Sequence, residues 1–157
     1  MNEKISSEDR QSMQAHYERL KEYSLSPTEN NSIASLINLI KNLRDKETGC
    51  PWDKEQDIKS FSKCIEDEAQ EVLESIHNND NDNLKEELGD LFFTLLFMIN
   101  LGQEKNIFTL EEVLDLTLKK LVFRHPHVFG NNPKKGISSA EAFELFQEAK
   151  LREKGNT

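Results

Sequence analysis

The sequence predicts an all-α protein, a helical bundle of about five helices. Apolar residues recur at spacings of three and four along most of the chain, as they do on one face of an α-helix. No stretch alternates convincingly between apolar and polar residues, as a half-buried strand would. The length of 157 residues fits one domain with its own hydrophobic core.

Two apolar stripes define the first helices. The stripe of the first comprises Ile33, Leu36, Ile37, Ile40 and Leu43. After an expected loop at residues 48–53, a second stripe with the same spacing runs through residues 58–76. Only Asn and Asp occupy residues 78–83, and their side chains compete with helical hydrogen bonds, so this segment is expected to be a turn.

The third helix, expected at residues 84–101, is apolar on nearly all of its faces between Leu91 and Met98. Such a helix belongs in the middle of a bundle. In a chain this short, we expect a second copy of the protein to cover it. Homo-oligomerisation would then complete the hydrophobic core.

Capping patterns mark the last two helices. A fourth helix is expected at residues 109–121, because it opens with a Thr-x-x-Glu capping box, and Pro126 bounds it. Residues 130–136 are expected to form a loop. Ser138 and Glu141 repeat the capping pattern at the start of the last amphipathic helix.

The chain is expected to comprise one folded domain between two polar ends. The N-terminal extension, partly helical or disordered, takes residues 1–31, the domain takes residues 32–153, and a disordered tail takes residues 154–157. A Ser-Pro sequence that begins at Ser26 breaks the chain shortly before the domain.

Composition and charge narrow the function. The formal net charge of −9 argues against nonspecific binding to nucleic acid or to an anionic membrane surface. The longest apolar run, residues 91–99, is far shorter than the roughly 20 residues that span a membrane. Cys50 and Cys64 show no metal-binding spacing, and together with the absence of a signal-peptide pattern they favour the reducing cytoplasm.

Four carboxylates form two pairs with the same spacing. Glu68 and Glu71 lie on the second helix, and Glu87 and Asp90 lie on the third. Asp90 directly precedes the apolar run, where an ionised carboxylate is costly unless a cation compensates it. Four such oxygen donors are the ligand set that Mg²⁺ prefers. We therefore take these residues as candidate ligands of a divalent cation.

Helical geometry places the four carboxylates on one edge of a hairpin. Counting 100° per residue, the acids of both helices are offset to the same side of the apolar stripe. The short turn makes the helices antiparallel, so these offsets fall on the same edge. Glu71 lies about seven residues before the turn and Asp90 about seven after it, which places the two pairs within roughly 5 Å in level. Without metal, these carboxylates would repel and raise one another's pKa values.

Three blocks of the sequence resemble, in order, those of the MazG family of all-α nucleoside triphosphate pyrophosphohydrolases. Residues 49–56 (GCPWDKEQ) resemble the family's G-C-P-W-D-x-x-Q loop. Residues 67–71 and 87–90 resemble its E-E-x-x-E and E-x-x-D metal motifs, and residues 124–130 (RHPHVFG) resemble its R-H-P-H-V-F block. The resemblance covers residues 33–151 and identifies the folded domain as MazG-like.

This resemblance implies Mg²⁺-dependent hydrolysis, with Mn²⁺ as an alternative ion, of nucleoside triphosphates to the monophosphate and pyrophosphate. It implies a role in housecleaning of the nucleotide pool, and assembly as a homodimer or a dimer of dimers. The metal-binding and catalytic residues it implies are Glu68, Glu71, Glu87 and Asp90. The substrate-binding residues it implies are Trp52, Lys54, Arg124 and His125.

Two positions depart from the family pattern. Asp67 replaces the first Glu of E-E-x-x-E, and we expect it to lie outside the ligand set. Phe123 occupies a position where the family often has a second basic residue, which leaves one phosphate contact and the nucleotide preference open.

The sequence leaves alternative interpretations of the function open. The acid pairs can be an ordinary charged helix face, and a non-catalytic nucleotide-binding or regulatory helical module would share the scaffold. A di-iron carboxylate bundle would need a second E-x-x-H besides that of Glu74 and His77, which the sequence lacks. Trp52 can contact the base or fill a gap against the first helix.

Overall fold

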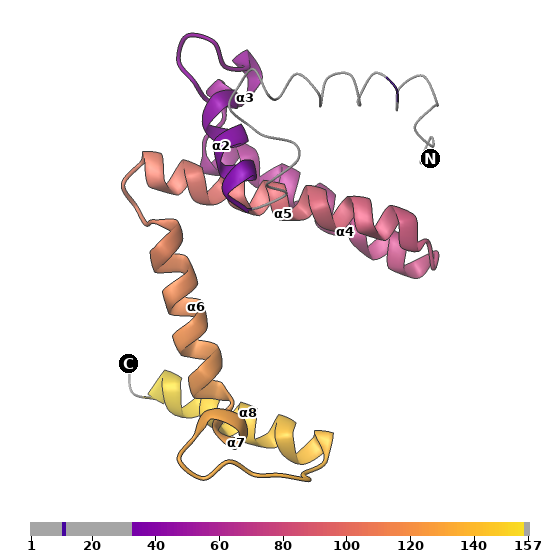
Figure 1. The fold of residues 1–157 in the computed structure, drawn as a ribbon, viewed down its shortest axis with the longest axis vertical. Helices are drawn as coiled ribbons and strands as arrows, with labels where there is room; N and C mark the ends of the chain where they lie inside the picture. Colours follow the sequence, from indigo (N-terminus) through magenta and orange to yellow (C-terminus); the bar gives the residue numbers. More distant parts are fainter. Residues whose placement is uncertain (1–10, 12–32, 156–157) are drawn as a thin grey trace. The chain divides into compact units, whose positions relative to one another are not determined.

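A computed structural model describes residue 11 and residues 33–155 (Figure 1). All regular secondary structure of these residues is helical, in agreement with the predicted all-α class. The described residues include seven α-helices and fall into two compact units, one ending at Lys105 and the other beginning at Asn106. Apart from Gln11, the predicted N-terminal extension lies outside the described residues, as do residues 156 and 157.

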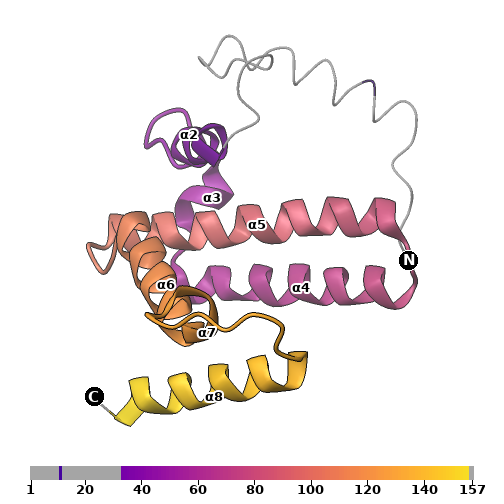
Figure 2. The ribbon, with the colours of Figure 1, turned by 60° about the horizontal axis from the view of Figure 1, so that its bottom comes forward.

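The first unit is built on a helical hairpin. Helices α4 (Ile58–His77) and α5 (Asn81–Glu104) run antiparallel and side by side (Figure 2). Helix α2 (Ile33–Leu43) packs on α5. The first three predicted helices are therefore confirmed.

The core of this unit lies between the hairpin and α2. Phe97 of α5 is fully buried, and its ring stacks on that of Phe61 of α4 with centroids 4.2 Å apart. Ile40 of α2 is also buried. Each such side chain stabilises the fold by about 1.5–3 kcal/mol through the apolar surface that it removes from water.

The hairpin turn is shorter than expected. It comprises only Asn78–Asp80, whereas we predicted a turn through residue 83. The Asp80 side chain accepts a hydrogen bond from the backbone N–H of Asn83, so it caps α5 at an earlier residue. The Asn83 amide then donates to the hydroxyl of Ser75 across the turn, 2.5 Å away. These bonds occupy polar side chains that would otherwise compete with the helix.

A short helix replaces part of the predicted loop before α4. Helix α3 (Pro51–Glu55) begins with Pro at its first position, where the missing N–H costs nothing and the fixed φ suits a helix. The prediction of a loop at residues 48–53 is wrong for its second half. Asp57 and Ser60 form a capping box at the start of α4.

The second unit holds helices α6 (Leu110–Arg124), α7 (Pro126–Phe129) and α8 (Ser139–Gly155). Both predicted capping boxes are present: Glu112 bonds to the backbone of Thr109, and Glu141 bonds to that of Ser138. Helix α6 extends three residues beyond its predicted end. The short α7 was not predicted, and α8 continues two residues into the segment that we assigned to a tail.

No helix among residues 33–155 is long and apolar enough to cross a membrane.

Candidate active site

Three of the four predicted ligands meet on the α4–α5 hairpin. One carboxylate oxygen from each of Glu68, Glu71 and Glu87 lies within 4.8 Å of the others. The two glutamates of α4 and the one of α5 share an edge of the hairpin, as helical geometry predicted. Asp90, one turn further along α5, is exposed and lies outside this group of three. We call the three glutamates the carboxylate cluster.

Glu87 is the most constrained member of the carboxylate cluster. It is only 6% exposed, and its carboxyl group shares a hydrogen bond with that of Glu71. Burial and the negative charge of Glu71 together raise the pKa of Glu87 to about 7. A positive charge supplied to these surroundings would favour the ionised form of the carboxyl group.

The pKa values of two other acids of the hairpin are raised as well. Burial, followed by the charges of Asp90 and Glu71, raises the pKa of Glu68. Burial and the charges of Glu86 and Glu71 raise the pKa of Asp90. The mutual repulsion that the sequence predicted is therefore present, and it extends to Asp90. Clustered carboxylate oxygens under mutual repulsion are suited to a divalent cation with a preference for oxygen ligands.

Asp67, the residue that departs from the E-E-x-x-E pattern, points to another partner. It pairs with Lys63, one turn earlier on α4, with the two charged atoms 2.7 Å apart. Lys63 also lies 3.4 Å from Glu66. Asp67 is absent from the carboxylate cluster, and its exclusion from the ligand set stays a prediction.

The two substrate-binding candidates of the first unit both lie on α3. Trp52 is 53% exposed, and its ring centroid lies 6.2 Å from that of Phe61 on α4. Its aromatic contact is therefore to α4, and about half of the side chain is exposed. The Lys54 ammonium donates to the backbone carbonyl of Lys46, 3.3 Å away.

The other two candidates belong to the second unit, where both contact α8. The Nε of Arg124 pairs with a carboxylate oxygen of Glu153 at 2.6 Å, and its guanidinium lies 5.9 Å from the ring centroid of Phe146. The Nδ1 of His125 lies 2.6 Å from the carbonyl of Leu121 and therefore donates to it, since a carbonyl only accepts. The His125 ring also meets the edge of Phe146.

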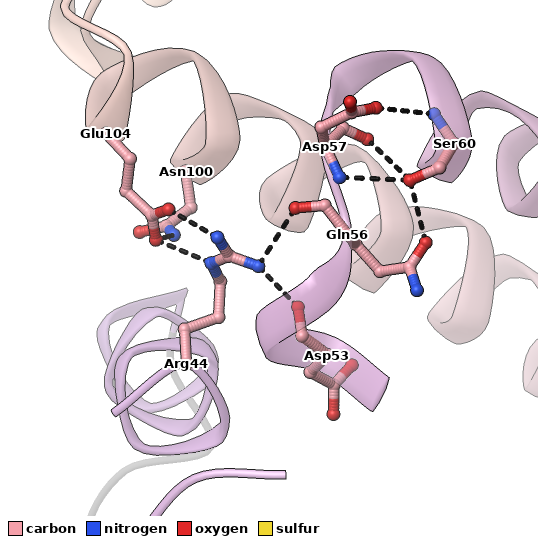
Figure 3. A network of polar contacts seen from close by, with 7 residues as sticks. All are labelled: Arg44, Asp53, Gln56, Asp57, Ser60, Asn100 and Glu104. Atoms are coloured by element: carbon pink, nitrogen blue, oxygen red, sulfur yellow. Dashed lines mark hydrogen bonds and ion pairs between the residues drawn. The ribbon is translucent and has the colours of Figure 1, made fainter. Parts of the chain in front are cut away.

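One polar centre of the first unit was not predicted. Figure 3 shows Arg44, directly after α2, bonded to Glu104 at the end of α5 and to two backbone carbonyls of residues 53 and 56. Arg44 lies five residues before the block at Gly49 that resembles the MazG family loop, and this nearness is the only local signal. Nothing in the sequence pairs it with a glutamate 60 residues away.

The fold and the carboxylate cluster together define an all-α protein with an acidic helical hairpin suited to a divalent cation. Residues 56–129 match the family model of the MazG nucleotide pyrophosphohydrolase domain. A solved structure of a MazG-related protein from Thermotoga maritima superposes with a TM-score of 0.63 at 29% identity, covering 76% of this chain and 99% of that one. The chain belongs to the MazG family.

Two relatives of known name have a higher sequence identity to this chain than the protein of that solved structure. The chain is 36% identical over 124 residues to the nucleoside triphosphate pyrophosphohydrolase of Escherichia coli K12, which covers 79% of this chain and 46% of the relative. It is 36% identical over 120 residues to the nucleoside triphosphate pyrophosphohydrolase/pyrophosphatase MazG of Thermotoga maritima, which covers 76% and 44%. The chain thus spans less than half the length of either relative.

Proposed function

We propose that this protein hydrolyses nucleoside triphosphates, ribo- or deoxyribonucleotides, to the monophosphate and pyrophosphate, with Mg²⁺ as cofactor and Mn²⁺ as an alternative. The observation that carries this proposal is the carboxylate cluster on the α4–α5 hairpin. Membership of the MazG family and the names of the two relatives support the type of reaction.

The donor set fits the proposed cofactor. The carboxylate cluster offers three oxygen ligands, and Asp90, whose charge acts on both Glu68 and Glu87, is the fourth ligand of the proposal. Bound Mg²⁺ would neutralise the triphosphate and the charge that develops on the leaving pyrophosphate. All four residues would then be catalytic residues because they hold this ion.

We propose that the carboxylates of the hairpin also act on the attacking water. The oxygen of a water molecule forms a bond to the α-phosphorus, and the bond from that phosphorus to the oxygen that bridges to the β-phosphorus breaks. That oxygen leaves with pyrophosphate. A carboxylate of the hairpin orients the water and accepts a proton from it.

Four residues are proposed to bind the nucleotide. Trp52 supplies a half-exposed aromatic surface for the base, and Lys54 supplies a positive charge on the same short helix. Arg124 suits a phosphate because its fork matches paired oxygens, although Glu153 occupies part of that fork in this structure. His125, which keeps Nδ1 bonded to the backbone, has Nε2 for a substrate contact.

We propose that two copies of the chain pair as a homodimer, or as a dimer of dimers. The support is an apolar stripe on α5 in which Leu88, Phe92 and Leu95 are each at least 41% exposed. Leu73 and Ile76 of α4 are exposed as well. A large apolar surface of this kind marks a protein interface. Light scattering of the purified protein measures the number of copies directly.

The setting that we propose is housecleaning of the nucleotide pool in the cytoplasm. The names of the two relatives support a role on nucleoside triphosphates, and the formal net charge of −9 disfavours nucleic acid as a partner. Because the protein and a phosphate substrate are both negatively charged, the bound cation would be needed to bring the substrate to the protein.

The test is to incubate the protein with a set of canonical and damaged nucleoside triphosphates and Mg²⁺, and to identify the products. We expect pyrophosphate and the monophosphate, and no turnover in excess EDTA. A diphosphate with orthophosphate would overturn the mechanism. Binding without hydrolysis, seen as quenching of the fluorescence of Trp52, would select the non-catalytic nucleotide-binding module instead.

A further inference from the structure

The polar centre around Arg44 joins three segments of the first unit (Figure 3). The Nε and Nη2 atoms of Arg44 each lie 2.6 Å from a carboxylate oxygen of Glu104, in the paired geometry that makes Arg–carboxylate contacts strong. Its Nη1 donates to the backbone carbonyl of Asp53 and to that of Gln56, the latter 3.3 Å away. The Arg44 side chain is only 12% exposed, so these bonds are largely shielded from water.

The two carbonyls that Arg44 binds lie at the C-terminal end of α3. The last carbonyls of a helix lack partners within it, and a helix of five residues is too short to be stable by itself. The Gln56 side chain adds to this support, because its amide donates to the carbonyl of Trp52 and its oxygen accepts from Ser60 at the start of α4. The Asp53 carbonyl also accepts a hydrogen bond from the backbone N–H of Gln56, 3.2 Å away, so Arg44 adds a second bond there and a bond to the carbonyl of Gln56.

A second path of contacts leads from Arg44 to Trp52 through the core. The Arg44 guanidinium lies 5.7 Å from the ring centroid of Phe97, which stacks on Phe61. The ring of Phe61 is in turn the aromatic neighbour of Trp52. Both the polar bonds and the aromatic stack thus end at α3, which carries Trp52 and Lys54.

Glu104 completes the arrangement. The hydrogen bond from Arg44 holds the pKa of Glu104 below its usual value, so the carboxylate stays ionised at neutral pH. The amide of Asn100, one turn earlier on α5, also donates to Glu104 at 2.7 Å. The Glu104 carboxylate is therefore held by both Arg44 and Asn100.

We propose that Arg44, with Glu104 as its counter-ion, is a positioning residue that holds α3 and thereby sets Trp52 and Lys54 for nucleotide binding. This proposal rests on the proposed function, in which these two side chains bind the substrate. Arg44 itself uses its fork on Glu104 and on the backbone, so it acts through α3 and does not touch the substrate.

The experiment compares Arg44→Lys and Glu104→Gln with the wild-type protein. Lys keeps the charge but cannot bond to the carboxylate and two carbonyls at once, and Gln keeps the shape of Glu104 without its charge. We expect each variant to raise KM about tenfold, while kcat changes by less than about twofold. Arg152→Lys and Glu148→Gln, at exposed positions of α8, are the matched controls and should leave both constants unchanged.

Trp52 provides a readout that needs no turnover, because it is the single tryptophan of the chain. Without nucleotide, Arg44→Lys and Glu104→Gln should shift its emission to longer wavelength and increase its quenching by acrylamide. The double variant should differ from the wild type by less than the sum of the single changes, since both substitutions break one unit.

Two results would overturn the proposal. One is a folded variant, judged by circular dichroism, with unchanged KM and unchanged Trp52 emission. The other is a loss of thermal stability without any split between KM and kcat, which would make Arg44 a purely structural residue. If the wild-type protein releases no pyrophosphate, the proposed function fails, and the Trp52 measurements alone decide whether Arg44 positions α3.

Discussion

Helix α5 carries two glutamates whose surroundings shift their pKa values in opposite directions. Glu87, near the start of the helix, is buried beside other carboxylates, and its pKa is raised to about 7. Glu104, at the end of the helix, receives two hydrogen bonds from Arg44, which lower its pKa. The same type of side chain is thus surrounded by like charges near one end of α5 and paired with a cation at the other end.

This difference separates the proposed cation site from a structural contact. At Glu104 the protein supplies its own cation, so the pair is complete without any further molecule. At Glu87 the neighbouring groups add negative charge, which disfavours the folded state unless something positive arrives from outside. The electrostatic cost near the start of α5 is the reason that this position suits the proposed cation site.

The largest effect should come from removing a carboxylate of the proposed metal site. Glu71→Gln and Asp90→Asn should each reduce turnover by at least about a hundredfold, because a neutral amide holds a divalent cation poorly. The helical content by circular dichroism should not change. Glu74→Gln, on an exposed part of α4, is the control and should keep full activity. Equal rates in all three variants would remove the carboxylate cluster from the reaction.

Addition of metal should stabilise the folded protein. With free Mg²⁺ at 100 times its Kd, we expect the free energy of unfolding to rise by about 2.7 kcal/mol, because only the folded state brings the carboxylates together. Melting curves in Mg²⁺ and in EDTA at equal ionic strength measure this. The gain should be lost in Glu71→Gln and kept in Glu74→Gln. Identical melting of the wild-type protein in both buffers would contradict the proposed site.

A smaller effect is expected at the opposite end of α5. Glu104→Gln should lower the free energy of unfolding by about 1 kcal/mol at pH 7, since it removes a charge-assisted contact that is partly exposed. The pKa of Glu104 is lowered in the folded state, so its stabilising contribution is present above its unfolded value of 4.5. This contribution disappears as the pH falls through the folded pKa. Urea unfolding at pH 7 and at pH 3.5 should therefore give different gaps between variant and wild type.

An effect of opposite sign is expected for Glu87→Gln without metal. The pKa of Glu87 rises from 4.5 to about 7 on folding, so the wild-type protein loses stability as the pH increases across this window. The variant avoids this loss. It should melt at a higher temperature than the wild type at pH 8 in EDTA, and at nearly the same temperature at pH 5. A lower melting temperature of the variant at pH 8 would show that Glu87 is already compensated.

The features that sequence predicted well are those fixed by neighbours in the chain. The capping boxes at Thr109 and Ser138 depend on a residue three positions away, so the starts of α6 and α8 could be located. The edge shared by Glu68, Glu71 and Glu87 follows from helical periodicity and a short turn, both of which are local.

The features that the sequence did not reveal depend on distant partners. Helix α3 was expected to be a loop, because its stability comes from Arg44 and Gln56 rather than from its own five residues. The early start of α5 depends on Asn83 bonding to Ser75 across the turn. Asp90 was expected to join the other three acids, yet its oxygen lies outside their group, a detail of side-chain position that periodicity does not set.

By itself, then, the sequence determined the all-α class, the order of the main helices, the acidic edge of the hairpin and the resemblance to the MazG family. Tertiary structure alone decided that Glu104, at the other end of α5, is paired with a cation. The physical reason is that an ionisable group responds to every charge and dipole within a few ångströms. For Glu104 the decisive neighbour is 60 residues away in the chain, and only folding brings it close.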